Sequence, residues 1–183
     1  MAYALRLATE ADVPALRELI PRSARALSVG YYTNRQVESM IRHAIGVDSQ
    51  LIVDGTYYVA VTEADGQIVG CGGWSKRQTL YGGDQMKGEA DPLLDPVTDA
   101  ARIRAFFVDP DHARQGIGRR IIAACEAAAW QAGFTRMELG ATLPGEPLYA
   151  AMGYAVTDHF DIALPEGEQL PCAHMAKTLG PDD

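Results

Sequence analysis

The chain has 183 residues, a formal net charge of −8 and a sequence pI near 4.9, with 48% hydrophobic and 22% charged residues. This composition excludes a disordered chain, which would be poor in apolar residues, and a general nucleic-acid-binding protein, which would carry a basic face. It indicates one folded, soluble domain with a sizeable core.

Membrane and disulfide-rich classes are also disfavoured. No apolar stretch reaches the ~20 residues that a membrane-spanning helix requires, and the stretch Met1 to Leu7 lacks the features of a secretory signal, so a cytoplasmic protein without a membrane partner is expected. Three cysteines, Cys71, Cys125 and Cys172, are too scattered for a disulfide framework or a metal site. They are predicted to be reduced and mostly buried thiols, and no metal is assigned.

The N-terminal part predicts a strand followed by two helices. Tyr3 to Leu7 is the strand candidate, and Thr9 to Asp12 begins a helix whose apolar side chains then recur at helical spacing. A second helix is predicted from Asn34 to about Ile45, because Thr33 and Gln36 have the spacing of a capping box.

A hairpin is predicted next, with strands at Thr56 to Thr62 and Gln67 to Trp74. Glycine weakens a strand, so the glycines inside the second strand indicate a close approach by another backbone or by a ligand. These glycines are Gly70, Gly72 and Gly73.

A loop predicted from Lys76 to Ala100 is long for a compact domain, and a role beside the substrate is left open for it. The strand Ala101 to Val108 follows. A glycine-framed loop with Gly116 and Gly118 then opens what is predicted to be the longest helix, which Gly133 ends.

This glycine loop has the properties of an anion cradle. Without side chains at Gly116 or Gly118 the backbone can approach a ligand closely, and the first N–H groups of a helix are unpaired and carry partial positive charge. A dinucleotide fingerprint is disfavoured, because Ile121 stands where a third Gly or Ala is needed. A nucleotide P-loop is disfavoured as well, because Arg119 and Arg120 replace its Lys-Ser/Thr pair.

The remaining elements complete an α/β fold. They are a strand, a short helix and two last strands, at Arg136 to Ala141, Pro147 to Met152, Ala155 to Leu164 and Cys172 to Thr178. The element order predicts a mixed sheet with helices on its faces, in a single domain over residues 1–179 with a disordered tail at 180–183.

Two stretches carry a family resemblance. The run from Phe106 to Gly118, Phe-Phe-Val-Asp-Pro-Asp-His-Ala-Arg-Gln-Gly-Ile-Gly, resembles the acetyl-CoA-binding motif of the GNAT (GCN5-related) N-acetyltransferase superfamily. Tyr149, four residues before the pair Gly153-Tyr154, is similar to the second landmark of that family. The resemblance covers about residues 101–154 and implies the acyl-CoA N-acyltransferase fold, with a mixed, mostly antiparallel central sheet flanked by helices.

The resemblance also implies a role for particular residues. The backbone N–H groups of Arg114, Gln115, Gly116, Ile117, Gly118 and Arg119 would hold the pyrophosphate of CoA. The main chain of Phe106, Phe107 and Val108 would pair with the pantetheine arm, and the Phe106 N–H would polarise the thioester carbonyl. Tyr149 would protonate the leaving thiolate; the alternative for Tyr149 is a core aromatic on a short helix.

The sequence departs from the family pattern at two positions. Ala113 stands where Arg or Gln is usual, but the cradle acts through backbone amides, so binding is expected to survive. Pro144 stands where an Asn is frequent, so a pantetheine contact from that side chain has no counterpart here.

The implied reaction is the transfer of an acetyl group from acetyl-CoA, as co-substrate, to an amine of a small molecule or peptide by direct attack in a ternary complex. The alternatives are transfer of another acyl group or to a hydroxyl, and a non-catalytic acyl-CoA-binding sensor or partner module. A homodimer is left open.

The acceptor side is less well defined by the sequence. Glu38, His43, Asp99 and Glu138 are candidate general bases on position alone, and each can equally be a surface residue. The acceptor is expected to be selected by the N-terminal helices, the linker 28–33 and the 76–100 loop, and the acidic composition makes polyamines or cationic drugs conceivable.

Overall fold

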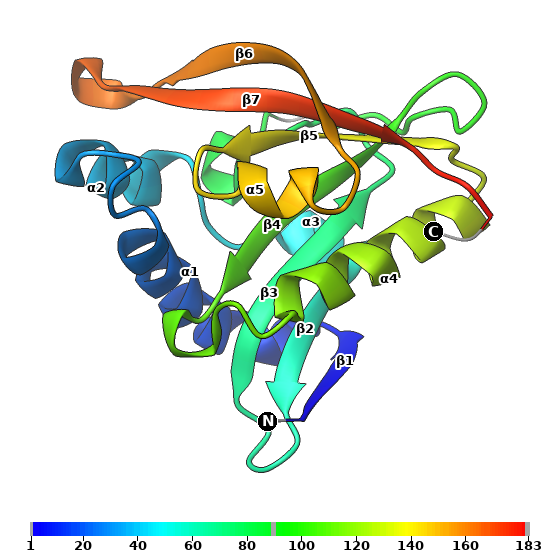
Figure 1. The fold of residues 1–183 in the computed structure, drawn as a ribbon, viewed down its shortest axis with the longest axis horizontal. Coiled ribbons are helices and arrows are strands. Elements are labelled where there is room, and N and C mark those ends of the chain that lie inside the picture. The colour runs from blue at the N-terminus through cyan, green and yellow to red at the C-terminus, as the bar shows by residue number, and fades with distance from the viewer. Residues whose placement is uncertain (1, 89–90, 182–183) are drawn as a thin grey trace.

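The protein is built on a mostly antiparallel sheet (Figure 1). The computed structural model describes residues 2–88 and 91–181 of the chain. In the described residues the sheet has seven strands in the order β1-β2-β3-β4-β5-β7-β6, and only β4 and β5 are parallel neighbours. The strands are β1 (Tyr3–Leu7), β2 (Tyr57–Thr62), β3 (Ile68–Ser75), β4 (Ala101–Val108), β5 (Arg136–Thr142), β6 (Ala155–Ala163) and β7 (Gln169–Thr178). This confirms the expected mixed sheet; of the predicted tail, residues 182 and 183 lie outside the described residues.

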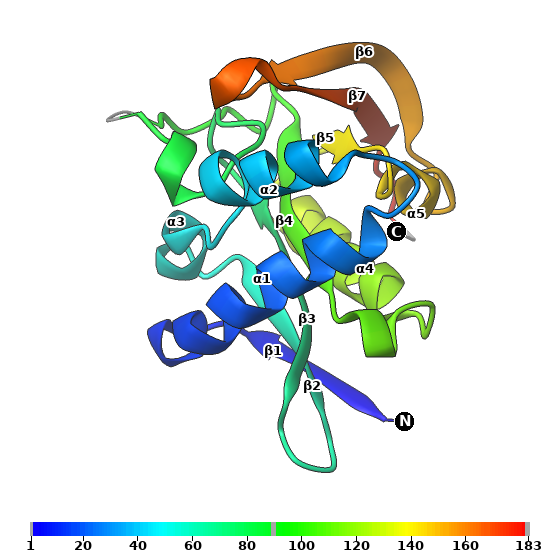
Figure 2. The ribbon, with the colours of Figure 1, turned by 90° about the vertical axis from the view of Figure 1, so that its left-hand side faces the viewer.

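Helices cover both faces of the sheet. α1 (Val13–Leu27), α2 (Asn34–His43) and α3 (Ser49–Val53) lie on one face, which is turned toward the viewer in Figure 2. α4 (Ile117–Gln131) and α5 (Glu146–Ala150) lie on the other face, in front of the sheet in Figure 1. The largest core cluster lies between α4 and the sheet, and a second cluster joins α1 and α3 to β2 and β3.

Most elements lie where the sequence predicted them. β1 and β4 have the predicted bounds, and α2 begins with the predicted capping box, in which the Thr33 hydroxyl accepts from the Gln36 N–H at 3.2 Å. α3 was not predicted, because five residues are too few to show helical periodicity. In its described residues, 76–88 and 91–100, the predicted loop Lys76 to Ala100 is largely irregular and has a short 3₁₀ turn at Asp84–Met86.

The glycines of β3 allow three close approaches. A Cβ atom on Gly70 would lie 2.7 Å from Ile117 of α4, one on Gly72 would lie 2.6 Å from the ring of Phe106, and one on Gly73 would lie 2.7 Å from the Thr56 carbonyl oxygen. The close approach expected here is therefore made by parts of the chain itself, namely two side chains and a backbone carbonyl.

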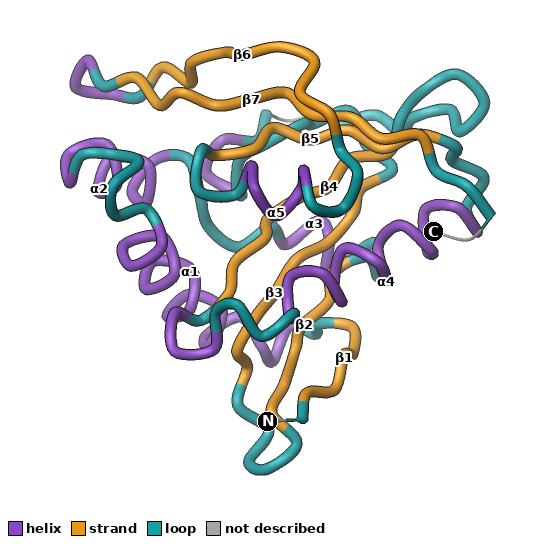
Figure 3. The backbone as a smooth tube through the Cα atoms, in the orientation of Figure 1, coloured by secondary structure: helices purple, strands orange, loops and turns teal. Residues whose placement is uncertain are grey.

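β4 and β5 separate soon after they meet. Only Ala101–Met137 and Arg102–Glu138 are paired between the eight residues of β4 and the seven of β5. Beyond these pairs the two strands diverge, as the backbone trace shows (Figure 3). The sheet consequently has an opening beside Phe106 to Val108.

Candidate functional site

A β-bulge lies in β4 at the start of the predicted cofactor strand. Two residues of β4, Ala105 and Phe106, face a single residue of β3, Gly72, and Ala105 has a φ of 54°, which is unusual for a residue other than glycine. The Tyr57 hydroxyl donates to the Ala105 carbonyl at 3.1 Å and holds the bulge. The bulge reorients the last three residues of β4 relative to the rest of the strand.

The backbone donors of this strand segment alternate between β3 and the opening. The Asp109 N–H donates to the Val69 carbonyl of β3 at 2.9 Å. Successive N–H groups of a strand alternate in direction, so the Val108 N–H points away from β3, and it donates to the Ser23 hydroxyl of α1 at 3.2 Å. By the same alternation, the Phe106 N–H, two residues earlier, faces the opening toward β5.

The glycine loop forms a concave row of N–H groups at the start of α4. Gly116 has a φ of 83° and Arg114 a φ of 64°, and such left-handed residues turn successive N–H groups toward one side. The first helical hydrogen bond runs from the Arg120 N–H to the Gly116 carbonyl, so the N–H groups of Ile117 to Arg119 have no acceptor within the helix. A Cβ atom on Gly116 would have no neighbour within 4 Å, so backbone conformation rather than packing requires glycine there.

The side chains of this loop divide into two groups. Gln115 accepts from the Tyr3 hydroxyl at 2.5 Å and Arg120 donates to the Tyr3 carbonyl at 2.7 Å, so both fasten the loop to β1. All four of these residues, Arg114, Gln115, Arg119 and Arg120, are exposed, so the contacts with Tyr3 are what distinguish Gln115 and Arg120. Of the two arginines that head the helix, Arg119 is therefore better placed than Arg120 to reach an anion in solvent.

The glycine loop and Tyr149, the two stretches that resemble the family, come together where α4 packs against α5. A Cβ atom on Gly118 would lie 2.8 Å from Leu148 of α5, so this glycine allows the two helices to approach. The next residue, Tyr149, is 8% exposed, and its ring meets the rings of Phe106 and Tyr154 edge-on, with centroids 6.1 and 6.0 Å apart. Burial raises the pKa of the Tyr149 hydroxyl above its ordinary value.

A cavity of about 230 Å³ occupies the opening between β4 and β5. Phe106, Phe107, Val108 and Tyr149 all line it, so the structure brings these predicted residues together. Tyr149 thus belongs to the core and to a cavity wall at the same time. The predicted residues 114–119 do not line the cavity; they lie at the start of α4, beside it.

None of the four candidate general bases lines this cavity. Glu38 and Glu138 form ion pairs with arginines, and Asp99 accepts a backbone hydrogen bond within the turn 95–99. His43 lies at the end of α2. Position in the sequence was a poor guide here, since it does not show which side chains face the opening.

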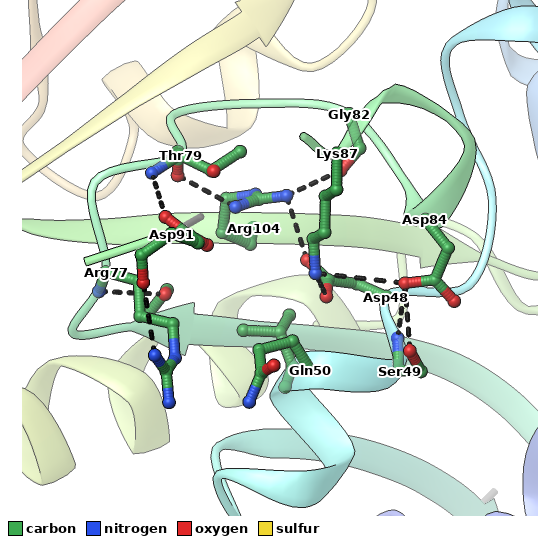
Figure 4. Close-up of polar contacts among 12 residues, drawn as sticks. Asp48, Ser49, Gln50, Arg77, Thr79, Gly82, Asp84, Lys87, Asp91 and Arg104 are labelled. Atoms are coloured by element: carbon green, nitrogen blue, oxygen red, sulfur yellow. Dashed lines mark hydrogen bonds and ion pairs between the residues drawn. The ribbon is translucent and has the colours of Figure 1, made fainter. Parts of the chain in front are cut away.

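Arg104 is a buried arginine that the sequence reasoning missed. Its side chain is 1% exposed, and its guanidinium donates to the carbonyls of Thr79 at 2.8 Å and Gly82 at 2.5 Å (Figure 4). It also forms an ion pair at 2.8 Å with Asp48, which is fully buried and pairs with Lys87 as well. Arginine in the apolar strand Ala-Arg-Ile-Arg-Ala was an available signal, because arginine is almost never fully buried unless paired.

These contacts fasten the 76–100 loop against α3 and β4. Asp84 of the loop accepts hydrogen bonds from the backbone N–H and the hydroxyl of Ser49 (Figure 4). Arg77 of the loop forms an ion pair with Asp54 at 2.7 Å. The stretch Leu80 to Gly83 between them lines the cavity.

The described part of the chain lacks two kinds of feature. Residues 2–88 and 91–181 contain no group of three or more His, Cys, Asp or Glu side chains that could hold a metal ion. Within the same ranges, no helix has the length and apolar character needed to cross a membrane. The three cysteines are all free and buried, as predicted.

Comparison with known structures shows the same fold in bacterial and archaeal acetyltransferases. A GCN5-related N-acetyltransferase from Rhodopseudomonas palustris is 20% identical with a TM-score of 0.71, covering 98% of this chain and 97% of that one. PaiA N-acetyltransferase from Thermoplasma acidophilum, in complex with coenzyme A, is 15% identical with a TM-score of 0.64, covering 97% and 99%. A GNAT family acetyltransferase from Brucella melitensis, in complex with acetyl-CoA, is 18% identical with a TM-score of 0.56, covering 98% and 90%.

The sequence comparison points to the same family. No curated protein matches the sequence. The model of the Acetyltransferase (GNAT) family matches residues 16–154, which is well over half of the chain and includes both the glycine loop and Tyr149. The chain therefore belongs to the GNAT acetyltransferase family.

Proposed function

We propose that the protein is an N-acetyltransferase that moves the acetyl group of acetyl-CoA directly to the amine of a small molecule or peptide. The observation that carries this proposal is the meeting of Phe106 and Tyr149 in one cavity, at the opening between β4 and β5 and beside the start of α4. Unpaired helix N–H groups, an open strand edge and a buried hydroxyl fit the phosphate, amide and thiolate parts of the co-substrate respectively.

Two segments of the chain bind different parts of the co-substrate. The N–H groups at 114–119 bind the pyrophosphate, with Arg114 and Arg119 exposed beside them. The main chain of Phe106 to Val108 pairs with the pantetheine amides. Because Ser23 already accepts from the Val108 N–H, Val108 contributes its carbonyl unless that bond is exchanged.

The chemistry is a substitution at the acyl carbon. Acetyl-CoA supplies the activated thioester, and the acceptor nitrogen forms a bond to the acyl carbon while the carbon–sulfur bond breaks. The Phe106 N–H donates to the carbonyl oxygen as it gains negative charge, a contribution typically worth about 3 kcal/mol. Tyr149 gives its proton to the departing sulfur and regains one as the amine nitrogen releases its own to solvent.

Direct transfer is favoured over a covalent cysteine intermediate. Cys172 lines the cavity, but burial raises its pKa to about 11, so it is a thiol at neutral pH. Cys125 is fully buried under the sheet, and burial raises its pKa well above its ordinary value. Neither has the thiolate character of a nucleophile.

Calorimetry with CoA tests the binding part of this proposal. Gly116→Asp places a carboxylate beside the helix N–H groups and strains a left-handed position, so CoA affinity is expected to fall at least tenfold. The matched control is Gly66→Asp, since Gly66 also has positive φ (72°) and open space around it but lies in the β2–β3 turn. No CoA binding by the unaltered protein, or equal losses in both variants, overturns the proposal.

A thiol-release assay with acetyl-CoA and a panel of amines tests the catalytic part. Amine-dependent release of CoA supports a transferase. CoA binding without release under any amine assigns the chain to the acyl-CoA-binding sensor class instead.

A further inference from the structure

The cavity extends past Phe106 and Tyr149 toward α1, α2 and the β6–β7 hairpin. Most of the side chains that line this far part are apolar, and they include Met40, Ala44, Ile45, Leu80, Ile162 and Leu170. The polar side chains on the α1 side, Ser23 and Ser28, are uncharged. Among the described lining residues there is no Asp, Glu, Lys or His. The acidic residues that give the chain its charge of −8 therefore lie elsewhere.

Arg104 is the one charged residue in the described lining, and its positive charge is already paired with a carboxylate inside the protein. Its guanidinium is bonded to the Thr79 and Gly82 carbonyls and paired with the fully buried Asp48. An acceptor carboxylate would have to break these bonds in order to bind Arg104. The far part of the cavity consequently offers no free charge of either sign.

The wall formed by the 76–100 loop presents an aromatic ring. Tyr81 lines the cavity and stacks on Phe160 of β6, with centroids 5.4 Å apart and planes 29° apart. Gly140 of β5 makes room for this pair, since a Cβ atom there would lie 3.2 Å from Phe160 and 3.4 Å from Tyr81. A flat aromatic surface favours aryl and branched alkyl groups over extended polar chains.

From this lining we infer that the acceptor is a primary amine carried on an uncharged hydrophobic body, such as an arylalkylamine or a branched alkylamine. This inference rests on the proposed function and names the acceptor class for the same site. A second ammonium group, as in a polyamine, or a carboxylate, as in an amino acid, would lose its water without gaining a partner. An apolar surrounding also favours the neutral, nucleophilic form of the reacting amine, which fits a lining without a carboxylate base.

An acceptor panel at saturating acetyl-CoA tests the inference. The rates of CoA release are compared for 2-phenylethylamine and 3-methylbutylamine, for 1,4-diaminobutane and spermidine, and for glycine and lysine. The hydrophobic monoamines are expected to have kcat/KM values at least tenfold above those of the other compounds. Equal or higher values for the diamine, spermidine or the amino acids overturn the inference while leaving the proposed function intact. If none of the amines supports the release of CoA, the proposed function is overturned, and the inference with it.

A matched pair of variants locates the selectivity in the cavity. Ile45 and Ile41 are both partly buried in the same core cluster, but only Ile45 lines the cavity. Ile45→Glu is expected to lower kcat/KM for 2-phenylethylamine at least tenfold and to narrow its advantage over 1,4-diaminobutane, whereas Ile41→Glu keeps the preference. Unchanged preference in Ile45→Glu, or the same change in both variants, contradicts the inference.

A comparison of octanoyl-CoA with acetyl-CoA as donor tests whether the apolar cavity binds the acceptor or the acyl chain. If the apolar cavity holds the acceptor, acetyl-CoA is the better donor and the preference among amines is retained. A higher kcat/KM with octanoyl-CoA, together with no preference for hydrophobic amines, assigns the cavity to the acyl chain and overturns the inference.

Discussion

The hydroxyl of Tyr149 lies at the junction of the two parts of the site. Gly118 allows α5 to approach the start of α4, and the Tyr149 ring packs edge-on against Phe106 at the bulge of β4. A change at this one side chain can therefore be tested against a neighbouring tyrosine that lies outside the cavity.

Tyr149→Phe is expected to lower kcat by about 100-fold, the range typical of general acid catalysis, with little change in CoA affinity. The control is Tyr154→Phe, because Tyr154 is buried beside Tyr149 but does not line the cavity. Steady-state rates and calorimetry on both variants give the comparison. Equal kcat in Tyr149→Phe and the unaltered protein would show that this hydroxyl is not the acid.

The pH dependence of kcat follows from the burial of the same group. Burial raises the pKa of Tyr149 above its ordinary value near 10, so the protonated form, which is the acid, persists to higher pH. The rate is expected to rise with pH as the acceptor amine loses its proton, with no decline below about pH 10. A kcat profile between pH 6 and 10 measures this, and a decline centred near pH 8 would assign the acid role to another group.

At the level of single residues, the sequence was informative where backbone conformation or chemistry is distinctive. Gly116 and Gly118 were predicted to let the backbone approach a ligand closely. The structure gives the first a left-handed φ and the second a tight contact with Leu148 of α5, and the approach of a ligand stays a prediction. Ser23 was not predicted, because a serine within a helix carries no sign that its hydroxyl reaches another strand.

Among the elements, the 76–100 loop depends on contacts distant in the sequence. Its stretch Leu80 to Gly83 forms a cavity wall that Arg104 of β4 holds through two carbonyl groups. Its Gly, Pro and Asp content was sufficient to predict a loop. Its conformation depends on the ion pair between Asp48 and Arg104, and the periodicity of the sequence does not show that these two residues are in contact.

Arg104→Lys is expected to raise the KM for the acceptor about tenfold and to leave the KM for acetyl-CoA within about twofold. Lysine keeps the charge toward Asp48 but cannot span both carbonyls, and charge-assisted hydrogen bonds contribute about 1.5–3 kcal/mol. The control is Arg77→Lys, since Arg77 fastens the same loop to Asp54 outside the cavity. Equal increases in both KM values would indicate general loss of structure rather than loss of the acceptor wall.

For the whole molecule, ligand binding should appear as thermal stabilisation. CoA at 100 times its Kd stabilises the folded state by about 2.7 kcal/mol, which for a chain of this length corresponds to a Tm increase of about 5–10 °C. Differential scanning calorimetry measures the shift, which is expected to be lost in Gly116→Asp and retained in Gly66→Asp. Similar shifts in the two variants would place CoA away from the start of α4.

The arrangement of the sheet was only partly predictable. The alternation of strands and helices was sufficient to predict a mixed sheet, and the family resemblance implied that it is mostly antiparallel. Neither the separation of β4 from β5 nor the bulge at Ala105 and Phe106 can be predicted from local periodicity, because both depend on partners in β3 and β5.

The opening between β4 and β5 also leaves unpaired strand edges inside the sheet. Unpaired strand edges can recruit a strand from a neighbouring molecule and so promote aggregation. Here α5 covers the opening on one face, and α1 and α2 cover it on the other, where they contact β4 and β7 (Figures 1 and 2). These helices therefore hinder a further polypeptide strand from pairing at the opening.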